Sequence, residues 1–62
     1  MPIVKIHLLE GREQEKKKRL VREVTEAICR SIDVKPQQVR IILDEMPRDN
    51  YSVGGELYSE RT

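Results

Sequence analysis

Hydrophobic and polar residues alternate near the start of the chain. In the stretch "IVKIHLL", residues 3–9, one face is wholly apolar and the other carries a lysine and a histidine. A period of two is typical of a strand that buries one face. We therefore predict a strand over residues 3–9, followed by a turn at residues 10–12, where Gly11 is free to adopt a positive φ.

The period of the pattern changes after this turn. Apolar residues now recur at spacings of three and four and form one stripe, made of Leu20, Val21, Val24, Ala27, Ile28 and Ile32. This spacing predicts an amphipathic helix over residues 13–32. Because Pro36 disfavours helical geometry at the residue before it, the helix is expected to end between Asp33 and Pro36.

Alternation returns after the helix. The stretch "VRIILD", residues 39–44, predicts a second strand with Arg40 on the face opposite Val39. Residues 46–50 are expected to form a loop. The stretch "YSVGGELY", residues 51–58, indicates a small hairpin, because two consecutive glycines can supply the positive φ angles of its turn.

A strand, a long helix and a second strand predict a βαβ unit with parallel strands and a right-handed crossover. We expect one α+β domain over residues 1–62. A single helix covers only one face of such a sheet, and the other face would expose Ile3, Leu9 and Ile42. With no Phe or Trp, 17 Ile, Leu and Val residues and one cysteine, the chain lacks both a large core and a disulfide. A second copy of the chain is therefore the expected cover.

The balance of charges gives no reason to expect a nucleic-acid partner. Twelve Lys and Arg residues face eleven Asp and Glu residues, for a formal net charge of +1. The basic run "KKKR", residues 16–19, is the exception, and nucleic-acid binding through it would require salt-sensitive affinity for DNA or RNA. Opposite charges recur along the helix at i,i+4 spacing and indicate a solvated, salt-bridged face: Glu13–Lys17, Glu15–Arg19, Arg19–Glu23, Arg22–Glu26 and Glu26–Arg30.

The chain also lacks the sequence features of a secreted or membrane protein. No run approaches the ~20 apolar residues that a membrane span needs. The opening strand contains Lys5 and His7 and does not resemble a signal peptide. The lone Cys29 suits a reducing compartment. We expect a cytoplasmic protein without a membrane partner.

Few residues offer catalytic chemistry. The only histidine, His7, has no Cys, His or carboxylate partner at a ligand spacing, so neither a metal nor another cofactor is predicted. The remaining candidate is Pro2. Removal of Met1 would turn its nitrogen into a secondary amine, which is a base or nucleophile, with Arg12 and Arg40 as nearby cations. The alternative is structural, because proline is tolerated at the first residue of a strand.

The segments "PIVKIHLLEGR", "LVREVTEAICRSI", "VRIILDEM" and "GGEL" resemble the 4-oxalocrotonate tautomerase family, in order and spacing, over nearly the whole chain. The resemblance implies a β-α-β unit that dimerises into a four-stranded sheet with two helices. Three such dimers would form a homohexamer with active sites at subunit boundaries. It also implies a cofactor-independent isomerase of aromatic hydrocarbon catabolism, in which Pro2 is the general base that ketonises 2-hydroxymuconate-like dienols to conjugated 2-oxo acids.

The same resemblance gives roles to further residues. Arg40, from a neighbouring subunit, would bind the 2-oxo group and proximal carboxylate and stabilise developing negative charge. Arg12 would hold the distal carboxylate. Tyr51 would stand in the family's hydrophobic wall, and the chain itself offers Ile3, Leu9 and Val53 as further apolar neighbours of Pro2. Partial burial and nearby cations both lower the pKa of an amine, which favours a base near the working pH.

Some positions depart from the family pattern and bear on the substrate. Tyr51 stands where the family often has Phe, and Tyr58 stands where a small residue is common. Relatives that hydrolyse halogenated acrylates carry an arginine at the position of Leu9 and a glutamate at that of Val53. This chain has neither, so a tautomerase is favoured over a dehalogenase. A non-catalytic oligomer that binds small anions through its arginines is the alternative.

Overall fold

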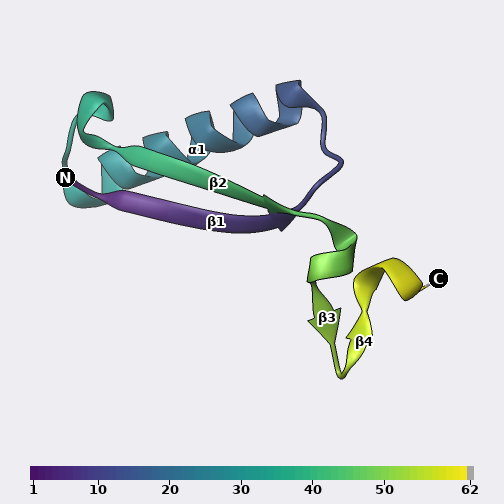
Figure 1. Cartoon of the computed structure of the whole chain (residues 1–62). Coiled ribbons are helices and arrows are strands. Elements are labelled where there is room, and N and C mark those ends of the chain that lie inside the picture. The colour runs from purple at the N-terminus through teal and green to yellow at the C-terminus, as the bar shows by residue number, and fades with distance from the viewer. Residues whose placement is uncertain (62) are drawn as a thin grey trace.

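The structure is a computed structural model that describes residues 1–61. Its main part is a βαβ unit (Figure 1). Strand β1 (Ile3–Leu9), helix α1 (Gln14–Ile32) and strand β2 (Arg40–Met46) follow one another along the chain. The two strands pair in parallel, with Ile3 opposite Arg40 and Leu9 opposite Met46. Helix α1 lies along one face of the sheet. The predicted βαβ unit is confirmed.

A small hairpin follows β2. Strands β3 (Ser52–Val53) and β4 (Glu56–Leu57) pair antiparallel. Gly54 and Gly55 have φ angles of 62° and 86°, as expected for the two central residues of a tight hairpin turn. The hairpin leaves the sheet at the end where β2 stops and projects away from the βαβ unit (Figure 1).

The predicted bounds of two segments were wrong. The second strand covers Arg40–Met46 and not 39–44, because its ladder with β1 continues to the pair Leu9–Met46. The expected loop at 46–50 begins one residue later, because Met46 belongs to β2, and it contains a short 3-10 turn at Arg48–Asn50. The helix ends where predicted, since Asp33 takes a left-handed conformation with φ 58° and donates its N–H to the carbonyl of Cys29.

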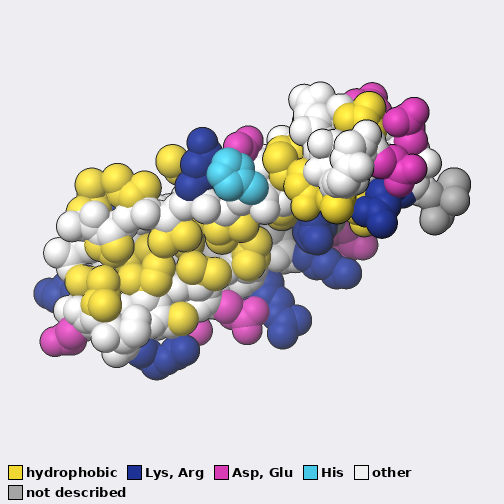
Figure 2. All heavy atoms as spheres, turned by 90° about the horizontal axis from the view of Figure 1, so that it is seen from below, with side chains coloured by type: hydrophobic (Ala, Val, Ile, Leu, Met, Phe, Trp, Pro, Cys, Tyr) yellow, Lys and Arg dark blue, Asp and Glu magenta, His cyan; other side chains and the backbone are white. Residues whose placement is uncertain are grey.

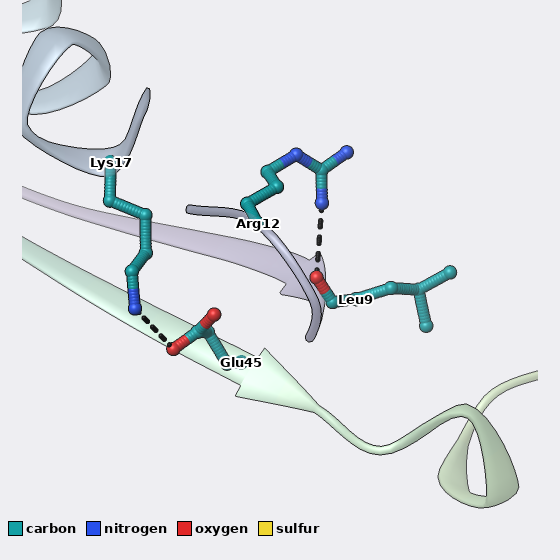
Figure 3. A network of polar contacts seen from close by, with 4 residues as sticks. All are labelled: Leu9, Arg12, Lys17 and Glu45. Carbon is teal, nitrogen blue, oxygen red and sulfur yellow. Dashed lines mark hydrogen bonds and ion pairs between the residues drawn. The ribbon is translucent and has the colours of Figure 1, made fainter. Parts of the chain in front are cut away.

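The apolar stripe of α1 is only partly covered by the sheet. Leu20, Val21, Val24 and Ile28 are half-buried, whereas Ala27 and Ile32 are exposed. Of the five predicted i,i+4 pairs, only Arg19–Glu23 forms within residues 1–61, at 3.1 Å. Lys17 instead reaches across to β2, where its Nζ lies 2.9 Å from Glu45 Oε1 (Figure 3). This ion pair ties the start of the helix to the sheet.

Residues 1–61 of one copy do not enclose a hydrophobic core. No residue among 1–61 is buried, and the Cα radius of gyration is 14.7 Å, against about 10.6 Å for a compact chain of this length. Its accessible surface of 5070 Å² compares with about 4,200 Å² for a folded monomer of this mass. Ile3 and Ile42, on the uncovered sheet face, are 62% and 51% exposed. Figure 2 shows hydrophobic side chains gathered in several patches on the surface. These values favour self-association.

Candidate functional site

Pro2 and Arg40 lie together at one end of the sheet. The backbone N–H of Arg40 donates to the carbonyl of Pro2 at 3.0 Å, which extends the parallel ladder by one step. Pro2 is half-buried, and Met1 before it is 73% exposed. With Met1 attached, the Pro2 nitrogen is an amide. Its removal would leave a secondary amine at the tip of the sheet.

The guanidinium of Arg40 is held by the chain just before β2. Its Nη1 donates to the carbonyl of Gln37 at 2.5 Å, within the 3-10 turn Pro36–Gln38 that precedes the strand. The side chain is nevertheless exposed. Arg40 therefore presents a fixed cation at the end of the sheet that carries Pro2, with guanidinium donors still free for a carboxylate or carbonyl oxygen.

Arg12 and Leu9 lie at the opposite end of the sheet. Arg12 Nη1 donates to the carbonyl of Leu9 at 3.0 Å (Figure 3). This hydrogen bond folds the arginine back onto the end of β1 and leaves the other guanidinium donors available. Leu9 is half-buried, and Arg12 is exposed.

The hairpin contributes an aromatic cluster near this second end. Tyr51 and Tyr58 place their ring centroids 6.0 Å apart at an interplanar angle of 51°. The Tyr58 N–H also donates to the Tyr51 carbonyl at 2.7 Å. Arg48 carries its guanidinium carbon 5.4 Å from the centre of the Tyr58 ring, within cation–π range. Tyr51 and Val53 are 40% and 49% exposed, so the predicted wall residues are open to a ligand or a partner.

A single chain therefore does not bring all six predicted residues together. Strand β1 has seven residues, and a strand rises about 3.3 Å per residue, so Pro2 and Arg12 lie roughly 20 Å apart. The structure brings Pro2 to Arg40 and places Leu9 with Arg12. A site that uses both ends needs residues from more than one copy.

An open cavity at the surface beside Arg12, lined mostly by exposed side chains, was not predicted from the sequence. Its volume is about 320 Å³, and it is lined by Arg12, Lys16, Lys17, Arg19, Leu20 and Glu23. The charge pattern of residues 16–19 indicates only a solvated, salt-bridged face. The sequence does hold one signal, since Lys16 has Arg12 and Leu20 at i−4 and i+4 and so lacks a carboxylate at either spacing.

The described residues contain no cluster suited to a metal ion. Among residues 1–61, no three His, Cys, Asp and Glu side chains lie close enough together to hold one. His7 instead pairs with Asp44 on the uncovered sheet face, at 2.9 Å between Nδ1 and Oδ2. Within the same range, no helix is long and apolar enough to cross a membrane.

Comparison with known proteins gives consistent matches along the chain. Residues 2–61 match the family model described as tautomerase enzyme. A 2-hydroxymuconate tautomerase from Pseudomonas putida is 52% identical over 60 residues, which cover 97% of this chain and 95% of the relative.

Solved structures agree with the sequence matches. A 4-oxalocrotonate tautomerase homologue has a TM-score of 0.94 at 44% identity, with 100% of this chain and 98% of the other covered. A heterohexamer 4-oxalocrotonate tautomerase from Chloroflexus aurantiacus J-10-fl has a TM-score of 0.93 at 35% identity, with both chains covered completely. The expected fold, a βαβ unit with a C-terminal hairpin, is confirmed by these likenesses.

Proposed function

This chain belongs to the tautomerase family, among the 4-oxalocrotonate tautomerases, and on that premise we propose that Pro2 ketonises 2-hydroxymuconate-like dienols. The chain is a tautomerase, and its mechanism and substrate are the subject of the proposal. The observation that carries the proposal is the hydrogen bond between the Pro2 carbonyl and the Arg40 N–H. It places the backbone of Pro2 beside the backbone of Arg40 at one end of the sheet, and the Arg40 guanidinium that meets a given Pro2 amine would come from a neighbouring subunit.

In the proposed mechanism, Met1 is removed and the Pro2 amine takes the hydroxyl proton of the dienol. The electron pair of the broken O–H bond forms the carbonyl, and the conjugated system takes a proton at carbon from the prolinium. Arg40 of a neighbouring subunit donates hydrogen bonds to the 2-oxo group and the proximal carboxylate, where negative charge develops. No group other than the side chains and the terminal amine takes part in these steps.

The substrate would be anchored at its far end by Arg12. Arginine binds a carboxylate with two parallel hydrogen bonds, which fixes the orientation of a dicarboxylate. Leu9, Tyr51 and Val53 would exclude water around the carbon chain. This division of roles assigns Arg12 to binding and Arg40 to stabilisation of the transition state.

We further propose that the site is completed by assembly. Strands β1 and β2 form a two-stranded sheet with a free edge on each strand. Antiparallel pairing of two β1 edges would set Pro2 of one copy beside Leu9 and Arg12 of the other, whereas parallel pairing would not. Support for a larger assembly comes from the similar protein that is a heterohexamer. The proposal is a homohexamer of single-domain chains, built from three dimers, that acts in aromatic hydrocarbon catabolism in the cytoplasm.

The test is an assay of methionine-free protein with 2-hydroxymuconate and with its monocarboxylate analogue. We expect ketonisation of both compounds, followed by absorbance, with a KM about tenfold lower for the dicarboxylate because only it can engage Arg12. Sizing of the same preparation checks that the active species is an oligomer. If the protein bound both compounds without turning either over, the non-catalytic anion-binding alternative would replace this proposal.

A further inference from the structure

The cavity beside Arg12 has the size and lining of a small-anion site. Its volume of about 320 Å³ falls at the lower end of small-molecule pockets, which begin near ~300 Å³. Four of its lining residues are cationic, one is apolar and one is acidic. Leu20 supplies the apolar part, so the cavity offers a hydrocarbon contact as well as positive charge.

Two of the four cations are neutralised by carboxylates. Arg19 pairs with Glu23 at 3.1 Å, and Lys17 pairs with Glu45 at 2.9 Å. Arg12 and Lys16 form no ion pair within residues 1–61, and the only hydrogen bond of the Arg12 side chain there goes to a backbone carbonyl. The cavity thus carries two uncompensated positive charges. One anion bound in the cavity would be attracted by both charges.

The position of Lys16 in the helix is also unfavourable without a ligand. Glu13 is the N-cap of α1, so Lys16 lies in the first turn, at the positive end of the helix dipole. A cation at this position is disfavoured by the helix dipole. A carboxylate bound beside Lys16 would be attracted by the lysine and by the positive end of the dipole. A residue that is unfavourable for its local structure, and whose contacts do not compensate for this, is often retained for function.

We propose that Lys16 is a specificity-determining residue that binds the distal carboxylate of the substrate together with Arg12 in this cavity. The inference rests on the proposed function for the identity of the substrate. Lys16 adds a second donor to the bidentate contact of Arg12. It selects dicarboxylates over monocarboxylates and leaves the chemical step at Pro2 unchanged.

The test compares Lys16→Gln with the matched variant Lys18→Gln. Lys18 is an exposed lysine of the same helix, does not line this cavity, and pairs with Glu15 at 3.5 Å. For Lys16→Gln we expect the KM for 2-hydroxymuconate to rise about fivefold with kcat within about twofold, because a contact made equally in ground and transition states is lost. The KM for the monocarboxylate analogue should stay within about twofold, and Lys18→Gln should change neither value.

Binding of adipate, a saturated six-carbon dicarboxylate, gives a readout that needs no turnover. Calorimetry should show weaker adipate binding in Lys16→Gln than in Lys18→Gln, and no such difference for hexanoate. If the wild-type protein turned over neither dienol, but Lys16→Gln still weakened adipate binding, the proposed function would be refuted and the inference supported. The inference would be overturned if Lys16→Gln and Lys18→Gln changed KM and adipate affinity equally. It would also be overturned if Lys16→Gln raised the KM for both dienols by the same factor.

Discussion

Replacement of Pro2 by alanine is expected to lower kcat for 2-hydroxymuconate by at least about 100-fold, the lower bound for loss of a general base. Alanine still leaves a primary amine after removal of Met1, so some basic group remains. That amine lacks the ring that fixes the position of the proline nitrogen at the end of β1. The loss should appear in kcat and in kcat/KM alike, because proton transfer belongs to the transition state.

The Pro2→Ala variant needs a structural control. Pro47→Ala removes an exposed proline from the connection after β2 and should leave kcat within about twofold. Both variants should keep the oligomeric size of the wild type, because neither removes a large apolar side chain. Undiminished turnover by Pro2→Ala, with removal of Met1 verified by mass, would show that the proline ring is not needed for the base.

Replacement of Arg40 by alanine is expected to lower kcat by about 10²–10³-fold, the usual effect of deleting one donor that stabilises developing negative charge. The guanidinium is held at the end of the sheet by its hydrogen bond to the Gln37 carbonyl, so it is oriented before the substrate arrives. Arg40→Lys should recover only part of the rate, since lysine keeps the charge but loses the planar donor pair.

Arg22→Ala is the matched control for Arg40. Arg22 is an exposed arginine on α1 and forms no ion pair within residues 1–61. Its removal should leave steady-state kinetics within about twofold. A variant at Arg40 that raised KM with unchanged kcat would assign this arginine to substrate binding and remove it from the stabilisation of the transition state.

The periodicity of the sequence was sufficient to predict the elements of the fold. Alternation located β1, the three-and-four spacing located α1, and the paired glycines located the hairpin turn. The end of β2 was misplaced because "EM" at residues 45–46 has no strong strand pattern. Its pairing partners Leu8 and Leu9 on β1 decide its conformation, and that information is not local.

The candidate site was less accessible to sequence reasoning than the fold. The pattern gave the residue types, but only the register shows that Pro2 adjoins Arg40 and lies a strand length from Arg12. The sequence does not distinguish Lys16, because it stands in a run of four consecutive basic residues at 16–19. Its neighbours Lys17 and Arg19 find carboxylates in three dimensions, and Lys16 finds none within residues 1–61.

The state of Met1 gives the most direct test of the central claim, that the Pro2 amine is the base. Two preparations of the same sequence would be compared, one with Met1 removed and one with Met1 retained, as verified by intact mass. We predict ketonisation of 2-hydroxymuconate by the first and a loss of at least about 100-fold in the second, because an amide nitrogen has no basic lone pair. Equal kcat values for the two preparations would contradict proline base catalysis in this protein.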